Sequence, residues 1–144
     1  MSQYAPIIIP TLNRYEHFKR CVESLSKCTY ASDTDLFIGL DFPPSEKYYE
    51  GYNNIKRYLS QIVGFKSVVI LDADHNLGVN ENCNRMYAYV RERGYKKYIF
   101  TEDDNEFSPN FLTYINWALN EYKDDKTIFA VCGFKRIDTR GLRN

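Results

Sequence analysis

The sequence predicts an α/β fold, a mostly parallel open sheet with helices on both faces. Three observations predict it. Short apolar runs rich in β-branched and aromatic residues are typical of buried strands, the segments between them have the spacing of one apolar helix face, and the two alternate about every 30 residues. Uninterrupted apolar strands separated by amphipathic helices favour a parallel sheet that is covered on both sides.

Five apolar runs are predicted as strands. Pro10 follows the first run and ends it. The second run ends in Asp41, with Pro43 and Pro44 close behind. The predicted strands cover residues 5–9, 36–40, 67–71, 98–100 and 127–132.

Four amphipathic segments are predicted as helices, because apolar residues recur in each at spacings of three and four. Ser45 is expected to cap the second helix, and Gly64 and Gly94 to end the second and third. Ser108 and Pro109 are placed at the N-cap and first turn of the fourth. The four apolar faces are Phe18, Cys21, Val22, Leu25 and Cys28; Tyr48, Tyr52, Ile55, Leu59 and Ile62; Val79, Cys83, Met86, Tyr87 and Val90; and Phe111, Ile115, Ala118, Leu119 and Tyr122.

Composition indicates one globular domain over residues 1–144. The length suits a single core, and 44% hydrophobic with 16% aromatic residues exclude a disordered chain. Lys+Arg and Asp+Glu balance at 19 each, so no nucleic-acid partner is expected. The cysteines, Cys21, Cys28, Cys83 and Cys132, form no Cys-x-x-Cys pair and are predicted to be reduced thiols in the core.

The sequence contains no candidate for membrane insertion. No apolar run approaches the roughly 20 residues that span a bilayer. The start of the chain lacks the charged and apolar regions of a signal peptide. We therefore expect a cytoplasmic protein, with peripheral association at the inner membrane face as a variant of that location.

Three adjacent acids, Glu102, Asp103 and Asp104, follow the fourth predicted strand. If strand geometry continues, Glu102 and Asp104 point one way and Asp103 the other, with roughly 6–7 Å between the first and third. Carboxylates this close repel unless a cation joins them, and Mg²⁺ or Mn²⁺ prefers oxygen ligands. Asp104 is the candidate metal ligand. The alternative, in which the acids cap the next helix or are solvated, fits the spacing equally well.

Polar side chains follow each of the first four predicted strands. In open α/β sheets ligands bind beyond the carboxyl ends of the strands, where the strand order reverses. One arginine among carboxylates suits a nucleoside diphosphate, with Arg14 on phosphate oxygens and Asp41 accepting from a base N–H or a ribose hydroxyl. Neither a dinucleotide-binding nor a P-loop glycine motif is present, so phosphate binding would rely on metal. The polar residues are Thr11, Asn13, Arg14, Asp41, Asp72, Asp74 and Glu102 to Asp104.

Four segments carry a family resemblance. They are Ile-Ile-Ile-Pro-Thr-Leu-Asn-Arg at residues 7–14, Asp41, Asn-Leu-Gly at 76–78, and Glu-Asp-Asp at 102–104 followed by Phe-Ser-Pro-Asn-Phe at 107–111. Together they resemble the nucleotide-sugar-binding half of GT-A fold glycosyltransferases, a Rossmann-like domain, and are similar to the family 2 type. The acid segment with its downstream Pro-x-Phe also resembles the N-acetylglucosaminyltransferase I group.

The resemblance implies a function for this half. Asp104 would bind Mn²⁺ or Mg²⁺ on the diphosphate of a nucleotide-diphospho-sugar, a UDP-sugar being favoured. Asp41 would face the nucleobase, and Glu102 and Asp103 would lie near the ribose or sugar. The acceptor would be a glycan or a lipid-linked hydroxyl. The implied nucleotide-binding residues are Thr11, Asn13, Arg14, Asp41, Asn76, Gly78, Glu102 and Asp103.

The sequence departs from the family in two respects. Many relatives carry Ala-Arg-Asn on the helix after the third strand, whereas this chain has Asn-Cys-Asn at 82–84 followed by Arg85, which weakens the case for a phosphate contact from that helix. Members are usually about twice this length or more, and their second half supplies the acceptor site and the general base. We therefore expect the acceptor-binding half to be lacking, assign no catalytic residue, and expect self-association through the surface where that half would dock.

Two other readings follow from the same residues. The domain could be a non-catalytic module that binds a nucleotide or a partner chain through the same fold. A signalling receiver-like domain has a similar length and rhythm, but its chemistry needs acids directly after the first strand, where this chain has residues 10–14, Pro-Thr-Leu-Asn-Arg. The receiver-like reading is therefore disfavoured.

Overall fold

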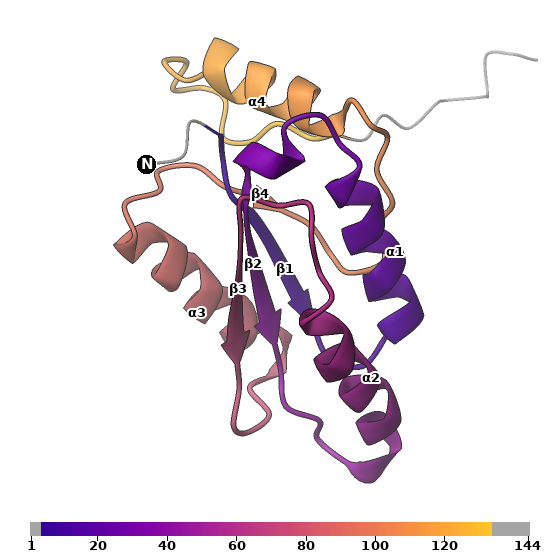
Figure 1. Cartoon of the computed structure of the whole chain (residues 1–144). Coiled ribbons are helices and arrows are strands. Elements are labelled where there is room, and N and C mark those ends of the chain that lie inside the picture. Colours follow the sequence, from indigo (N-terminus) through magenta and orange to yellow (C-terminus); the bar gives the residue numbers. More distant parts are fainter. Residues whose placement is uncertain (1–3, 134–144) are drawn as a thin grey trace, which may run out of the picture.

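A four-stranded parallel sheet forms the centre of the chain (Figure 1). The structure is a computed structural model, and it describes residues 4–133. The strand order is β3-β2-β1-β4, and each neighbouring pair is parallel. This confirms the predicted α/β class. The strands are β1 (Ile7–Thr11), β2 (Asp35–Leu40), β3 (Ser67–Asp72) and β4 (Ile99–Phe100).

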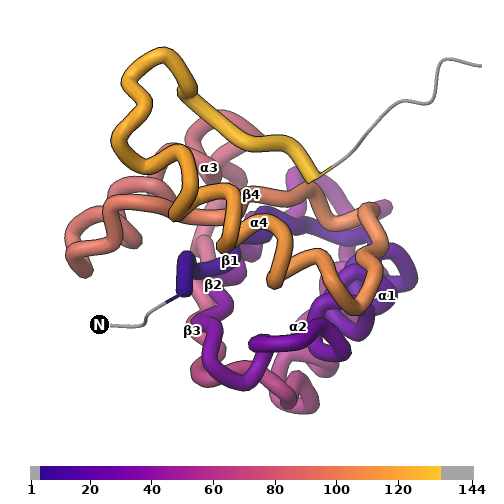
Figure 2. Tube along the Cα trace, turned by 90° about the horizontal axis from the view of Figure 1, so that it is seen from above, coloured from indigo at the N-terminus to yellow at the C-terminus, as the bar shows by residue number. Residues whose placement is uncertain are grey.

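Helices cover both faces of the sheet, as predicted. In Figure 1, α1 and α2 lie on one side of the strands and α3 on the other, and Figure 2 shows α4 seen from above, near the start of β1. Two short 3₁₀ helices precede β2 and α2. The helices are α1 (Tyr15–Ser26), η1 (Ala31–Asp33), η2 (Glu46–Tyr48), α2 (Tyr49–Leu59), α3 (Gly78–Glu92) and α4 (Phe111–Glu121).

Alternate residues of β1 enter different cores, because side chains on a strand point to opposite faces. Ile7 and Ile9 pack in the larger cluster, whereas Ile8 packs in the smaller one with Met86 and Val90 of α3. The larger cluster also holds the buried faces of α1, α2 and α4. These helix residues are Phe18, Cys21, Val22, Leu25, Tyr52, Ile55, Tyr58, Leu112 and Ile115.

Strand β1 continues through Pro10, although the sequence predicted that Pro10 would end it. Pro10 pairs in register with Gly39 of β2, and the strand runs on to Thr11. On its other side β1 pairs with β4 only at Ile7 and Ile8. The next rung toward β4 would need an N–H from residue 10, which proline lacks, so the ladder ends there. Proline is tolerated at this position because the side of β1 that faces β4 has no paired residue beyond Ile8.

The predicted fifth strand at 127–132 is wrong. These residues form no strand and join no sheet in the described chain. Phe129 is fully exposed, and the Cys132 thiol, predicted to be in the core, is exposed as well. An edge strand needs a neighbour with free N–H and C=O groups, and the two-residue β4 offers few. Cys21, Cys28 and Cys83 are free and buried, as predicted.

Three predicted helix ends also differ. Helix α2 ends at Leu59 with Ser60 at its C-cap, before Gly64 is reached. Helix α4 begins at Phe111 with Asn110 at the N-cap, so Ser108 and Pro109 lie before it. The Ser108 carbonyl accepts from the Phe111 N–H, and the Pro109 carbonyl accepts from the Thr29 N–H, both at 3.0 Å, so these residues form a turn tied to the end of α1. Ser45 precedes the 3₁₀ helix η2 rather than an α-helix, and its hydroxyl makes no capping bond.

No helix within residues 4–133 is both long enough and apolar enough to cross a membrane.

Candidate functional site

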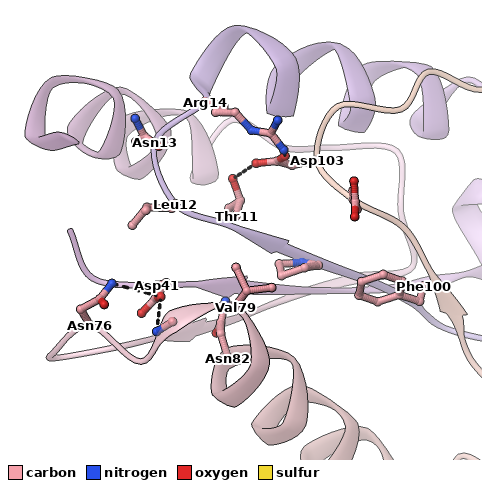
Figure 3. A pocket seen from close by; sticks show the side chains of 13 residues that line it. Thr11, Leu12, Asn13, Arg14, Asp41, Asn76, Val79, Asn82, Phe100 and Asp103 are labelled. Carbon is pink, nitrogen blue, oxygen red and sulfur yellow. Dashed lines mark hydrogen bonds and ion pairs between the residues drawn. The ribbon is translucent and has the colours of Figure 1, made fainter. Parts of the chain in front are cut away.

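A pocket of about 380 Å³ lies at the carboxyl ends of the strands (Figure 3). The chain builds the sheet outward from β1 to β3 and then returns to place β4 on the other side of β1. The strand order therefore reverses at β1, and the pocket opens at that point, where ligands bind in open α/β sheets. The residues that line it are Pro10, Thr11, Leu12, Asn13, Arg14, Asp41, Asn76, Gly78, Val79, Asn82, Phe100, Glu102 and Asp103.

One end of the pocket is ionic. The Thr11 hydroxyl donates to Asp103 at 2.8 Å, and the Arg14 guanidinium bonds the other oxygen of the same carboxylate. A second Arg14 nitrogen bonds Asp104 at 2.9 Å. Burial lowers the pKa of Arg14, but Asp103 and Asp104 outweigh burial and raise the pKa above its ordinary value. Asp103 is only 4% exposed, so these partners compensate for removing its charge from water.

The acids do not follow strand alternation, which corrects the predicted orientation. Strand β4 ends at Phe100, and the chain turns at Asp103 and Asp104. Because of this turn the two carboxylates converge on one guanidinium instead of pointing apart. Glu102 lines the pocket and is exposed.

The other end of the pocket is organised by Asp41. Its carboxylate accepts from the Phe42 and Leu77 N–H groups at 2.8 Å, from the Gly78 N–H at 3.0 Å and from the Asn76 side-chain amide at 3.3 Å. Each oxygen therefore carries two bonds, which use its acceptor capacity. Asp41 also places a negative charge at the N-terminus of α3, where the helix dipole favours one.

Gly78 allows this arrangement at the first residue of α3. Its φ of 76° is a left-handed conformation that side chains other than glycine rarely adopt. The turn points the Leu77 and Gly78 N–H groups at Asp41. The predicted nucleotide contacts at Asn76 and Gly78 thus lie at the pocket wall, where each donates to Asp41. An Asp41 contact to a nucleobase stays a prediction, and would require one of the four bonds to be given up.

A crystal structure of S. aureus TarS, a staphylococcal glycosyltransferase, shares this fold. The match has a TM-score of 0.59 and 13% sequence identity, and covers 84% of this chain and 20% of TarS. The chain therefore spans about one fifth of the length of TarS. No protein-family model matches the sequence, and neither does any curated protein sequence. The likeness establishes a glycosyltransferase-like α/β fold.

The structure places every predicted site residue at this edge of the sheet. Asp104 does not line the pocket and reaches it only through Arg14. The roles assigned to these residues in binding stay predictions. The predicted residues that line the pocket are Thr11, Asn13, Arg14, Asp41, Asn76, Gly78, Glu102 and Asp103.

Asn82 is a pocket residue that the sequence analysis did not place in the site. Its amide donates to the Gly39 carbonyl at 2.9 Å, and its oxygen accepts from Arg85 at 2.9 Å. Asn82 is one helical turn after Gly78, and this i, i+4 spacing puts the two on the same face of α3. That spacing is the signal that could have found it. Val79 and Phe100, exposed apolar residues in the pocket wall, carried no comparable signal.

Arg85 lies outside the pocket and holds the ends of two strands. Its guanidinium donates to the carbonyls of Leu40 at 3.1 Å, Leu71 at 2.8 Å and Asp72 at 3.3 Å. Since it also bonds Asn82, both terminal nitrogens and Nε are engaged. A phosphate contact from Arg85 would require it to give up some of these bonds, and whether the helix after β3 makes a phosphate contact stays a prediction.

Cys21 lies beneath the acid segment, with its thiol 3.7 Å from the Glu102 carbonyl. Burial, followed by the charges of Asp103 and Asp104, raises the pKa of Cys21 to about 12. The thiol therefore stays protonated at neutral pH and is a poor nucleophile.

The donor set suits a cation held jointly with a ligand. Within residues 4–133 no group of three or more His, Cys, Asp or Glu side chains converges on one point. Two carboxylates, Asp103 and Asp104, do converge on Arg14. Mg²⁺ and similar hard cations are commonly bound by one or two carboxylates, with phosphate oxygens of a substrate and water completing the shell. The residues present therefore fit Mg²⁺ or Mn²⁺ when a diphosphate supplies the remaining oxygens.

Proposed function

We propose that this domain binds the nucleotide-diphospho-sugar donor of a family 2-like GT-A glycosyltransferase, together with Mn²⁺ or Mg²⁺. The supporting observation is that one pocket joins the Thr11–Asp103–Arg14 group to the Asp41 loop at the switch point of the sheet. Its volume of about 380 Å³ lies within the usual range for small-ligand sites, roughly 300–1,000 Å³. The fold likeness to TarS, a glycosyltransferase, supports glycosyl transfer as the class of function.

The residues divide the work between the two ends of the pocket. Asp103 and Asp104 hold the divalent cation, with Asp104 as the more exposed ligand. Asp41 keeps the 76–78 loop and the start of α3 in place, so that the loop forms one wall for the nucleoside. Val79 and Phe100 offer apolar surface for a base or sugar ring. Glu102 is placed beside the ribose or the sugar.

The bound cation would supply Lewis-acid stabilisation of the departing nucleoside diphosphate. Transfer further requires a base to deprotonate the acceptor hydroxyl, and we assign that role to no residue of this chain. A UDP-sugar is the favoured donor, and a glycan or lipid-linked hydroxyl the acceptor. The location remains the cytoplasm or the inner membrane face, and self-association remains part of the proposal.

Nucleotide binding tests the proposal directly. Thermal unfolding is followed with UDP, GDP and their sugars, each with and without Mn²⁺. A ligand at 100 times its dissociation constant stabilises the folded state by about 2.7 kcal/mol, so binding gives a clear rise in Tm. We expect the rise for a uridine nucleotide only when Mn²⁺ is present. No metal-dependent shift with any nucleotide would refute the proposal.

Asp104→Asn gives the matched variant. It removes a carboxylate on the pocket rim while keeping the size of the side chain, and the residue is partly exposed, so the fold is expected to survive. The Mn²⁺-dependent Tm rise should fall sharply. Glu106→Gln is the control, because Glu106 is exposed, pairs with Arg20 and does not line the pocket.

A non-catalytic module of the same fold is the second candidate. It is favoured because the pocket and its bonds account for binding, whereas no residue within 4–133 is assigned as the base that transfer requires. A donor-hydrolysis and transfer assay on the chain separates the two candidates. Nucleotide binding without any turnover would support the module.

A further inference from the structure

Arg14 occupies the place between Asp103 and Asp104 that the proposed function gives to a cation. One of its terminal nitrogens bonds Asp103 and the other bonds Asp104, so the guanidinium bridges the two carboxylates. Figure 3 shows Arg14 and Thr11 both directed at Asp103. A positive charge of the chain itself therefore balances these acids when no ligand is bound.

Asp103 cannot lose Arg14 without a replacement. Its side chain is 5% exposed, and besides Arg14 its one side-chain partner in the described residues is the Thr11 hydroxyl. Removing one member of a buried ion pair leaves an uncompensated charge, which is strongly unfavourable. The guanidinium is therefore held until another cation reaches Asp103.

The Arg14 side chain has room to move once another cation reaches Asp103. Its side chain is 48% exposed, in contrast to that of Asp103. The Arg14 backbone carbonyl accepts from the Phe18 N–H of α1, but its side chain makes no capping bond there, so the guanidinium can move without breaking a contact to the helix. Arg14 also lines the pocket, so a guanidinium that leaves the carboxylates stays within reach of a bound ligand.

The charges at the acidic end of the pocket favour exchange of the Arg14 guanidinium for a divalent cation over binding of a diphosphate alone. Glu102, Asp103 and Asp104 against Arg14 carry a net formal charge of −2. A diphosphate entering such a site would be repelled unless a divalent cation came with it. With the cation on the carboxylates, the guanidinium becomes available for bidentate bonds to phosphate oxygens, which it matches in geometry.

We propose that Arg14 is a built-in counterion that a divalent cation displaces from Asp103 and Asp104, after which the guanidinium binds the diphosphate. This rests on the proposed nucleotide-sugar function and adds a mechanism for coupling the two ligands. Because binding couplings are reciprocal, cation and nucleotide each strengthen the binding of the other.

The test measures Mn²⁺ binding without nucleotide, using the electron paramagnetic resonance signal of the free ion. Arg14→Gln removes the competing charge, so it should bind Mn²⁺ at least tenfold more tightly than wild type. The same variant should bind UDP more weakly than wild type at saturating Mn²⁺, because the phosphate contact is lost. Arg20→Gln is the control. Arg20 lies nearby on α1 and pairs with exposed Glu106 at 3.1 Å, and both affinities should match wild type.

A second measurement uses the native chain and does not depend on a variant folding. With ¹⁵N-labelled arginine, the Arg14 Nε–H resonance should shift as Mg²⁺ and UDP are added, while that of Arg20 stays in place. An unchanged Arg14 resonance at saturating Mg²⁺ and UDP would overturn the inference, as would Mn²⁺ affinity in Arg14→Gln no higher than in wild type.

Failure of the proposed function gives a different result. Wild-type protein would then show no metal-dependent response to any nucleotide, and the inference would fall with it. If wild type binds UDP with Mn²⁺ but Arg14→Gln leaves Mn²⁺ affinity unchanged, the function stands and only the exchange is refuted.

Discussion

Gly51, in the first turn of α2, packs directly on the backbone carbonyl of Asn13. A Cβ at position 51 would overlap the Asn13 oxygen and come within 3.2 Å of the Asn13 Cβ. Asn13 belongs to the loop after β1 that lines the pocket. The missing side chain thus lets α2 support that loop from behind.

Gly51→Ala should destabilise the protein. In an open helix this change stabilises by about 1 kcal/mol, because glycine is a poor helix former. Here the methyl group meets backbone that cannot rotate away, and overpacking of this kind costs about 1–3 kcal/mol. Urea unfolding should therefore show a net loss. Asn53→Ala, at an exposed position of the same helix, should change the free energy of unfolding by less than about 0.5 kcal/mol. A free energy of unfolding of Gly51→Ala equal to or higher than that of wild type would mean that α2 moves away from Asn13 without loss of stability.

Asp41→Ala should release the loop at residues 76–78. Three backbone N–H groups, those of Phe42, Leu77 and Gly78, lose their acceptor. Hydrogen bonds to a charged group contribute about 1.5–3 kcal/mol each, and water can replace part of this at a pocket wall, so we expect a loss of about 3 kcal/mol. Asp41→Asn keeps one acceptor oxygen and should lose less.

Amide hydrogen exchange locates the effect of Asp41→Ala. The Leu77 and Gly78 amides should exchange much faster than in wild type, while amides in the centre of β2 change only with global stability. Unchanged protection at Leu77 and Gly78 would show that Asp41 does not hold the loop.

The sheet and its helices were predictable because their signals are local. The spacing of Phe18, Cys21, Val22 and Leu25 defines the buried face of α1, and all four are buried in the structure. The positions of the polar residues were predictable for a similar reason. Once the strands are parallel, Thr11, Asp41 and the acids after β4 must share one edge.

The contacts at that edge were not predictable, because they depend on loop geometry. Nothing in the sequence indicates that a turn brings Asp104 and Asp103 onto the same guanidinium. Nor does it indicate that the Asp41 carboxylate accepts hydrogen bonds from the 76–78 loop. The strand prediction at 127–132 was wrong for a related reason, because a strand forms only where a neighbouring strand offers unpaired backbone groups.

Asp35 makes stability depend on pH in the acid range. Burial raises the pKa of Asp35, but bonds from Ser67 and Tyr95 and the charge of Lys66 outweigh it and lower the pKa below its ordinary value. A lowered folded pKa gives stability that is present above the unfolded value, about 3.9, and is lost as pH falls through the folded value.

Asp35→Asn should therefore matter most at neutral pH. We expect it to cost about 2 kcal/mol at pH 7, through weaker bonds to Ser67 at 2.7 Å and Tyr95 at 2.6 Å. The difference from wild type should shrink between pH 4 and pH 2, measured by urea unfolding at each pH. A difference that stays constant over this range would show that Asp35 does not carry the acid dependence.

Arg85→Met should loosen the carboxyl ends of β2 and β3. Arg85 donates to the carbonyls of Leu40, Leu71 and Asp72, and methionine keeps an apolar stem without any donor. Water can reach part of this edge, so the expected loss is about 1–3 kcal/mol in urea unfolding. The free energy of unfolding of Arg85→Lys should lie between those of wild type and Arg85→Met, because a single ammonium cannot match the fork of the guanidinium. Arg91→Met, on an exposed position of the same helix, controls for the loss of charge and should leave stability nearly unchanged. Leu40 directly precedes Asp41, whose carboxylate accepts from the Gly78 N–H, so Arg85→Met should also speed amide exchange at Gly78. Equal exchange at Gly78 in Arg85→Met and Arg91→Met would show that the ends of β2 and β3 do not influence the pocket wall.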